Sequence, residues 1–145
     1  MKGCCVMEQT LVIIKPDGVR RKLAGRIIQR FEDRQLTITG LQVAMMDREL
    51  AKIHYDHLKD KPFFNEILDY MTSGPVIYMV LEAENAVELV RGMVGFTDGL
   101  KAAPGTIRGD FAINKDENVI HASDCREAAQ TEIARFFGVS LNPVA

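Results

Sequence analysis

The sequence predicts an α/β fold of the α+β type, in which helices pack on a four-stranded antiparallel sheet. Four short segments rich in apolar, β-forming residues are spread along the chain, and segments with helical spacing of apolar residues separate them. The chain of 145 residues, with 47% hydrophobic and 26% charged residues, has the length and composition of one ordinary globular domain.

The first predicted strand and helix flank the motif "KPDG". Residues 10–14, "TLVII", form a continuous apolar run, which is typical of a central strand buried on both faces. Pro16 suits the first turn of a helix, and Asp17 complements the positive end of that helix. One face of the amphipathic helix that follows is formed by Ala24, Ile27, Ile28 and Phe31.

The middle of the chain predicts a second strand and two helical segments. Residues 36–46, "LTITGLQVAMM", have the pattern of a strand, with Gly40 at a bulge. Residues 47–59 form a charged segment that favours a helix. A second helix is expected after Pro62, because apolar residues recur there at helical spacing: Phe63, Ile67, Tyr70 and Met71.

A third strand is expected over residues 75–83, "PVIYMVLEA". Asn85 is a candidate cap for a helix that runs to about Met93. The segment 95–110, "GFTDGLKAAPGTIRGD", contains four glycines and one proline. A loop of that length inside a compact domain is usually functional or disordered.

The last strand is predicted over residues 118–122 and the last helix over residues 124–137, where Asp124 and Glu127 have the spacing of a capping box. The predicted order is therefore β-α-β-(α)-β-α-loop-β-α. Split βαβ units of this kind form the ferredoxin-like βαββαβ sandwich.

No repeat, low-complexity tract or linker divides the chain, so one domain is expected over residues 1–145. Residues 1–7 have the character of a loose N-terminal extension. Residues 138–145 follow the last predicted helix as a short C-terminal tail.

Charge and composition exclude several classes of function. The net charge of −2 provides no general attraction for nucleic acid, so any polyanion must be bound by local cations. The longest apolar run, about residues 75–81, is too short to span a bilayer, and the N-terminus lacks the features of a secretory signal. Three cysteines, an odd number without metal-ligand spacing, favour a reducing, cytoplasmic location: Cys4, Cys5 and Cys125.

The common phosphate-binding loops are missing, because the chain contains neither GxxxxGK[ST] nor GxGxxG. Phosphate binding would therefore depend on side chains at the ends of the predicted elements, and the candidates are Lys15, Arg91, Thr97 and Arg108. Any one of these cations alone is more simply a solvated surface residue. Gly105 and Gly109 on either side of Arg108 permit a close backbone approach, which a surface cation would not need.

His121 is the strongest candidate for a reactive side chain. It directly follows apolar strand residues, and the small residues Ala122 and Ser123 after it leave room for a partner at the ring. A helix N-terminus at about Asp124 would favour an anion nearby, and a neutral imidazole has a free lone pair with which to attack phosphorus. Glu132, on the same predicted helix, is a plausible carboxylate to fix the tautomer. The simpler alternatives are a structural histidine and a solvent-facing glutamate.

Two other histidines, His54 and His57, lie three residues apart in the charged segment. Since no third ligand is evident, they are interpreted as surface residues and not as a metal pair.

Five motifs span nearly the whole chain: "KPDGVRRKLAGRIIQRFE", "HYDHLKDKPFF", "SGPVIYMVLE", "PGTIRGDF" and "NVIHASD". In the order and spacing of these motifs, residues 8–137 resemble the nucleoside diphosphate kinase family. Each motif alone is suggestive, whereas the five together are highly specific. The resemblance implies the ferredoxin-like fold and the transfer of a γ-phosphoryl group from a nucleoside triphosphate to a nucleoside diphosphate.

By this resemblance, His121 is the nucleophile of a ping-pong mechanism that passes through a phosphohistidine. Glu132 matches the carboxylate that holds the histidine, and Ser123 matches a serine near the ring. Lys15 matches the lysine that contacts phosphate and the ribose 3′-hydroxyl, and Asn118 matches the asparagine that binds the ribose.

The resemblance also assigns the rest of the nucleotide site. The family's phosphate ligands correspond to Arg91, Thr97 and Arg108. Phe63 matches the aromatic residue that stacks on the base, and such stacking binds every base, because each has a π-face. Tyr55 matches a tyrosine that lines the catalytic pocket.

The implied partners are nucleoside di- and triphosphates, with Mg²⁺ carried by the nucleotide phosphates and not by protein side chains. No obligatory nucleic acid and no membrane are expected. Family members form homo-oligomers, and a hexamer is favoured over a tetramer. Two departures from the family pattern are His57, where many members have an acidic residue, and Gly99, which is often proline and here permits a more mobile loop.

Two alternative functions belong to other classes. A catalytically silent, nucleotide-binding or regulatory family member should have lost one of the motif residues, yet all of them are present. A ferredoxin-like nucleic-acid module would need a basic sheet face with exposed aromatic residues, whereas this chain is acidic and only 7% aromatic.

Overall fold

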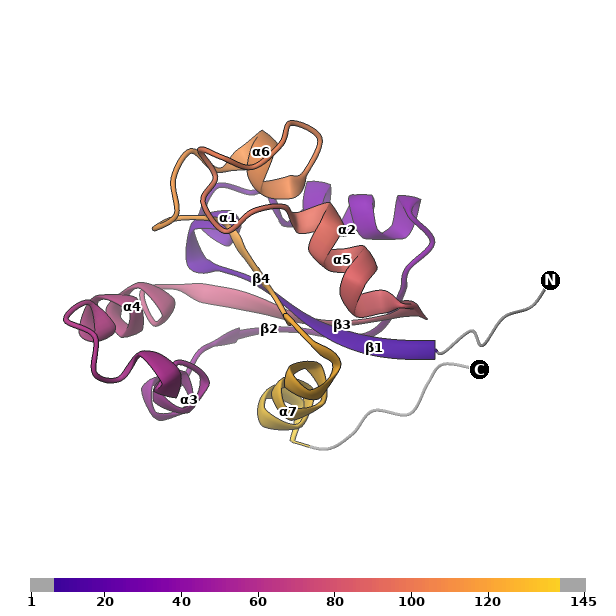
Figure 1. Ribbon diagram of the computed structural model, residues 1–145. Coiled ribbons are helices and arrows are strands. Elements are labelled where there is room, and N and C mark those ends of the chain that lie inside the picture. The colour runs from indigo at the N-terminus through magenta and orange to yellow at the C-terminus, as the bar shows by residue number, and fades with distance from the viewer. Residues whose placement is uncertain (1–6, 139–145) are drawn as a thin grey trace.

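The computed structural model describes residues 7–138 (Figure 1). Its strands are β1 Met7–Ile14, β2 Thr37–Met45, β3 Pro75–Glu84 and β4 Ile120–Ala122. Its helices are α1 Pro16–Arg20, α2 Ala24–Asp33, α3 Arg48–His54, α4 Phe64–Met71, α5 Ala86–Val94, α6 Ile107–Phe111 and α7 Arg126–Phe137. A 3₁₀ helix, η1 Asp56–Leu58, lies between α3 and α4.

The four strands form one sheet in the order β2-β3-β1-β4, and all neighbouring strands are antiparallel. β1 lies in the interior of the sheet, with Ile13 opposite Tyr78 of β3 on one side and His121 of β4 on the other. The five residues 10–14 are all buried, which agrees with the apolar run in the sequence. The predicted α+β, ferredoxin-like fold is confirmed.

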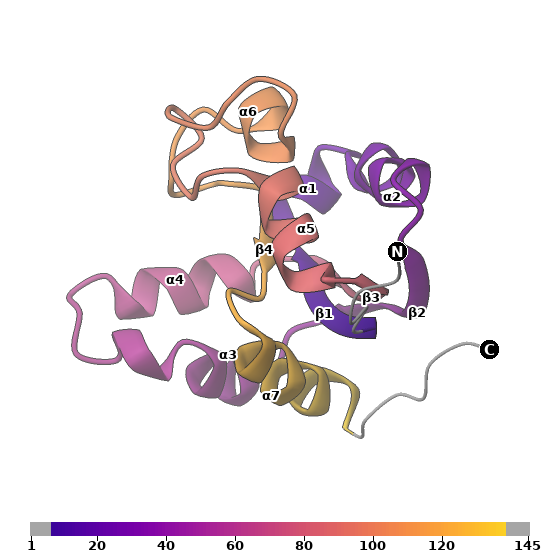
Figure 2. The same cartoon turned by 45° about the vertical axis from the view of Figure 1, so that its right-hand side comes forward.

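Helices cover both faces of the sheet (Figures 1 and 2). Because side chains alternate along a strand, Val12 and Ile14 of β1 pack in one core with residues of α2 and α5, whereas Leu11 and Ile13 pack in a second core with residues of α3, α4 and α7. Figure 2 shows α3 and α4 as an antiparallel pair beside α7. Because helices cover both faces, the edge strand β4 also has a helical layer on each side.

β2 forms the other edge of the sheet. Its register against β3 shifts between Ile38 and Gly40, so the bulge predicted at Gly40 is present. Toward the end of the strand, three large apolar side chains are more than half exposed: Leu41, Val43 and Met45. An exposed apolar edge strand is a surface suited to pairing with another chain.

Part of the predicted glycine-rich loop is helical, which the sequence did not suggest. α6 begins after Thr106, whose hydroxyl accepts a hydrogen bond from the Gly109 N–H at 3.0 Å, and it carries Arg108. A side chain at Gly109 would overlap the carbonyl oxygen of Ala103. The predicted close backbone approach is therefore confirmed at Gly109, where the contact is made inside the loop. It is wrong at Gly105, where a side chain would meet no atom within 4 Å.

Two other local predictions are wrong. The capping box of Asp124 and Glu127 does not form, because α7 begins two residues later than predicted and Cys125 occupies its N-cap, where Sγ accepts from the Ala128 N–H at 3.4 Å. Met7, predicted to belong to a loose extension, is the first residue of β1. Residues 1–6 of the predicted extension and 139–145 of the predicted tail lie outside the described residues. None of the described helices is long and apolar enough to cross a membrane.

Candidate active site

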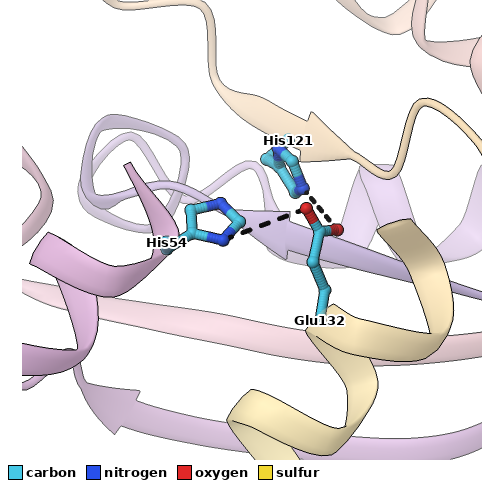
Figure 3. A group of neighbouring side chains, drawn as sticks. All are labelled: His54, His121 and Glu132. Atoms are coloured by element: carbon cyan, nitrogen blue, oxygen red, sulfur yellow. Dashed lines mark hydrogen bonds and ion pairs between the residues drawn. The ribbon is translucent and has the colours of Figure 1, made fainter. Parts of the chain in front are cut away.

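His121 lies on the short strand β4. Its partner on β1 is Ile13, which belongs to the core beneath α3, α4 and α7. The residues on either side of it, Ile120 and Ala122, are buried in the opposite core. The alternation of side chains along the strand therefore turns His121 toward α3 and α7, and Figure 3 shows its ring directed at His54 and Glu132.

Glu132, on α7, receives two hydrogen bonds at one oxygen. His121 Nε2 lies 3.0 Å from Glu132 Oε1 (Figure 3), and Ser123 Oγ donates to the same atom at 2.6 Å. Burial by itself raises the pKa of Glu132, but the hydrogen bond and charge of His121, with the hydrogen bond from Ser123, outweigh burial and lower that pKa below its usual value. Glu132 is therefore a carboxylate at neutral pH.

The prediction that His54 is a surface residue is wrong. His54 is only 6% exposed, and the centroid of its ring lies 4.8 Å from that of His121, with the two ring planes nearly perpendicular. Burial, followed by the charge of His121, lowers the pKa of His54 to about 3, so the ring is neutral at physiological pH. A signal for its position was available, because Ala51 and His54 lie i, i+3 apart on the buried face of α3. His57 is exposed, as expected.

His54, His121 and Glu132 also have the side-chain types of a metal site, and their ligand atoms all lie within 4.8 Å of one another. Two of the atoms that could bind such a metal, His54 Nδ1 and Glu132 Oε1, already accept hydrogen bonds. Arg135 Nη1 lies 3.0 Å from His54 Nδ1, and Glu132 accepts from both His121 and Ser123. Because a guanidinium is a permanent cation that only donates, this cluster is a hydrogen-bonded network and not a metal centre.

Lys15 follows β1 directly and begins the cationic side of the site. Its Nζ donates to Oδ1 of Asn118 at 2.7 Å, and Nδ2 of Asn118 donates to the carbonyl oxygen of Thr97 at 3.0 Å. Burial, helped by the charge of Arg108 and opposed by that of Asp17, lowers the pKa of Lys15 to about 8. Three of the candidate residues, Lys15, Thr97 and Asn118, are thus joined by one chain of hydrogen bonds.

Two arginines approach β4 from different helices. Arg108, on α6, is 4% exposed and donates to the carbonyl oxygens of Gly95 at 3.1 Å and Ile120 at 2.5 Å. Arg91, on α5, donates to the carbonyl oxygen of Ala122 at 3.3 Å. Burial and the charge of Arg91 lower the pKa of Arg108 to about 10. Within residues 7–138 the buried Nε of Arg108 has no hydrogen-bond partner, and such unpaired groups are uncommon outside functional sites.

Tyr55 and Phe63 come from the segment that contains α3, η1 and α4. The Tyr55 ring packs edge-on against His54 at 4.7 Å, and burial, followed by the charges of Glu132 and Tyr78, raises the pKa of Tyr55 above its usual value. Phe63 lies at the N-cap of α4 and is 42% exposed. Tyr55 therefore belongs to the His121 network, whereas Phe63 presents a ring surface to solvent.

A strained residue, Val119, lies between Asn118 and β4. Its φ of 76° is in the left-handed region, which is costly for a β-branched residue. The Asp17 carboxylate accepts the Val119 N–H at 3.1 Å and also accepts the hydroxyl of Tyr70, while the Lys15 N–H donates to the Val119 carbonyl at 2.8 Å. The sequence suggested only a helix-end role for Asp17, but its hydrogen bonds fix the turn that carries Asn118.

The comparison with protein families decides the assignment, because the model described as "Nucleoside diphosphate kinase" matches residues 8–140. The chain belongs to the nucleoside diphosphate kinase family. A relative of that name from Acetivibrio thermocellus is 58% identical over 131 residues, covering 90% of this chain and 96% of the relative. Another from Saccharolobus islandicus is 53% identical over 135 residues, covering 93% and 98%.

Solved structures agree with this membership. The structure of a halophilic nucleoside diphosphate kinase from Halobacterium salinarum in complex with CDP has a TM-score of 0.92 and 43% identity to this chain. The match covers 97% of this chain and 94% of the Halobacterium chain. This protein is accordingly a phosphotransferase that acts on nucleotides, transferring the γ-phosphoryl group of a nucleoside triphosphate to a nucleoside diphosphate. The catalytically silent alternative is not favoured.

Proposed function

We propose that the kinase reaction passes through a phosphohistidine formed on Nδ1 of His121. The observation that supports this proposal is the hydrogen bond between His121 Nε2 and the Glu132 carboxylate. Because a carboxylate only accepts, Nε2 must carry the proton, and the lone pair of the neutral ring is then on Nδ1. Glu132 also balances the positive charge that the ring acquires when this lone pair is used.

The first half-reaction forms a bond from His121 Nδ1 to the γ-phosphorus and breaks the bond from that phosphorus to the β–γ bridging oxygen, which leaves with the nucleoside diphosphate. In the second half-reaction, a terminal β-phosphate oxygen of another nucleoside diphosphate attacks the same phosphorus, and the Nδ1–P bond breaks. Since phosphoryl transfer depends mainly on positioning and charge stabilisation, the remaining residues act as donors and cations.

The phosphate-binding role belongs to Arg91, Thr97 and Arg108 in this proposal. The buried guanidinium of Arg108, held by two backbone carbonyls, is suited to a fixed position on phosphate oxygens. Lys15 contacts phosphate and the ribose 3′-hydroxyl, and Asn118, already hydrogen-bonded to Lys15, contacts the ribose.

Nucleotide bases stack on the exposed ring of Phe63, which gives affinity without a choice of base. Tyr55 and Ser123 support the reacting group, Tyr55 from the wall beside His54 and Ser123 through Glu132.

The donor set fits Mg²⁺ that is bound by nucleotide phosphates and not by a protein cage. Asp17 and Glu132, the two shielded carboxylates beside the site, already accept hydrogen bonds from protein groups. Three cations also surround the site, Lys15, Arg91 and Arg108, and their charge disfavours a bare metal ion. When bound, Mg²⁺ supplies positive charge that neutralises the transferring phosphate oxygens.

The working form is proposed to be a homo-oligomer, with a hexamer favoured over a tetramer, in the cytoplasm. Two groups of exposed apolar side chains support association: Leu41, Val43 and Met45 on β2, and Phe96, Leu100 and Ile113 around the glycine-rich loop. Light scattering after size-exclusion chromatography measures the mass and so distinguishes a hexamer from a tetramer. The mass of a monomer would contradict both assemblies.

The direct test of the proposed function is the intact mass of the protein after brief exposure to ATP and Mg²⁺, beside the variant His121→Asn. One added phosphoryl group that is acid-labile, is discharged by GDP and is absent in the variant is expected. A well-folded wild-type protein that gains no phosphoryl group, or a variant that gains it equally, would show that His121 is not the nucleophile.

A further inference from the structure

Behind Glu132, the active-site network continues to a residue that no step of the proposed reaction uses. Arg135 follows Glu132 at i+3 on α7, and its Nη1 lies 3.0 Å from His54 Nδ1. The same His54 nitrogen lies 3.9 Å from Glu132 Oε2, the carboxylate oxygen that the His121 hydrogen bond does not use (Figure 3). Glu132 therefore faces two imidazole rings, one at hydrogen-bond distance and the other beyond it.

The contact from Arg135 fixes the tautomer of His54. A guanidinium has donors and no acceptor, so Nδ1 of His54 must be unprotonated to accept this hydrogen bond, and the ring proton is on Nε2. With a lone pair on Nδ1, His54 has no proton on the nitrogen that lies nearer to Glu132 Oε2. The 3.9 Å separation between the two atoms is consistent with a pair that does not share a hydrogen bond.

Without the arginine, the same ring would be a competitor for the carboxylate. A proton on Nδ1, in either the other tautomer or the imidazolium, would point at Glu132 Oε2 and draw the carboxylate from His121. Four charged or titratable groups on other elements act on His54: His121 on β4, Glu132 and Arg135 on α7, and Lys15 at the end of β1. On its own segment, the ring of Tyr55 packs against His54. Of these, Arg135 is the one whose hydrogen bond occupies the Nδ1 lone pair.

We propose that Arg135 is a positioning residue that acts through His54 to reserve the Glu132 carboxylate for His121. The inference rests on the proposed role of His121 as the phosphorylated residue. Within residues 7–138, the side chain of Arg135 hydrogen-bonds to His54 and not to His121 or to the cations of the phosphate site, so its loss should lower kcat and leave the KM for nucleotides unchanged.

The test compares Arg135→Met, Arg135→Lys and a matched control, Arg126→Met, which removes an exposed arginine from the first turn of the same helix. Nitrogen NMR of protein labelled at the histidine rings reports the tautomer of His54 directly. In Arg135→Met we expect a gain of Nδ1–H signal and a fall in kcat of about threefold to tenfold, the effect of one weakened hydrogen bond. Arg135→Lys, which can still donate, should recover the wild-type tautomer and most of kcat, and the control should match the wild type.

A double-mutant comparison distinguishes action through His54 from general stabilisation. In a His54→Phe background, Arg135→Met should have no further effect on kcat. An equal loss of kcat in both backgrounds, or a lower Tm in Arg135→Met with unchanged kcat and tautomer, would overturn the proposal. Failure of the proposed function is distinguishable, because it would appear as absence of a phosphohistidine in the wild-type protein, whatever the tautomer of His54.

Discussion

The two halves of the site are held in place in different ways. The nucleophile half consists of His121, Ser123 and Glu132, and hydrogen bonds of 3.0 and 2.6 Å between side chains join it. The cation half consists of Lys15, Arg91 and Arg108, which donate to the Asn118 side chain and to backbone carbonyls. Within residues 7–138, none of these three cations forms a salt bridge, whereas surface arginines such as Arg30 and Arg48 do.

This difference separates two physical tasks. In the nucleophile half, a carboxylate balances the imidazole and assigns its proton, so the reactive lone pair is fixed before substrate binds. In the cation half, hydrogen bonds to neutral groups hold the side chains without neutralising them. Their charge is therefore available to the phosphates, and a bound anion would oppose the burial that lowers the pKa values of Lys15 and Arg108.

The largest effect is expected from breaking the cation half at its buried member. Arg108→Met should lower kcat/KM by about a hundredfold to a thousandfold, because a preorganised donor to the transferring phosphate is removed. Arg20→Met, which removes an exposed arginine paired with Glu117, is the control. Steady-state kinetics, with Tm measured in parallel, test whether Arg108 acts in catalysis. A lower Tm with kcat/KM within threefold of the wild type would show that Arg108 has a structural role only.

A smaller effect is expected in the nucleophile half. Glu132→Gln should reduce kcat by about tenfold to a hundredfold with little change in KM, because a charged hydrogen-bond partner is replaced by a neutral one. Glu127→Gln, exposed on the same helix, should behave as the wild type.

The same variant has a pH signature in stability. Because the folded-state pKa of Glu132 is below its usual 4.5, the carboxylate contributes stability at neutral pH that is lost as pH falls below 4.5 through the folded pKa. The wild type should therefore lose more Tm than Glu132→Gln between pH 7 and pH 3.5. Equal losses would contradict the pairing of Glu132.

The smallest expected effect is a change in nucleotide affinity at alkaline pH. Since the pKa of Lys15 is about 8, its charge is lost as pH rises through that value, and the KM for ADP should increase by about fivefold to tenfold between pH 7 and pH 9. Unfolding does not explain this increase, because a lowered lysine pKa costs stability below pH 8, and that cost diminishes as pH rises toward 10.5. Lys15→Met should have a high KM that does not change over this range; a wild-type KM independent of pH would show that Lys15 stays charged.

Much of the fold was accessible from local patterns. The buried run of β1, the bulge at Gly40 and the last helix follow from hydrophobic periodicity and glycine placement, which are properties of neighbouring residues. The helix α6 was missed because its sequence is rich in glycine, and its N-cap bond from Thr106 became visible only in the structure. At Gly99 the backbone N–H donates to the Asn114 carbonyl at 3.0 Å, a bond that the proline common in the family could not make.

The sequence by itself determined the order of strands and helices, the placement of His121 on the last strand, and the family to which the chain belongs. His121 is, however, the middle residue of that last strand and not its end. Tertiary structure alone decided that His54 is buried beside His121, that Arg135 occupies its Nδ1, and that Asp17 holds the strained Val119. The reason is separation along the chain: Arg135 lies 81 residues from His54, and Val119 lies 102 residues from Asp17. Periodicity assigns each residue to a face of its own element, but only the packing of elements decides which residue it meets across that face.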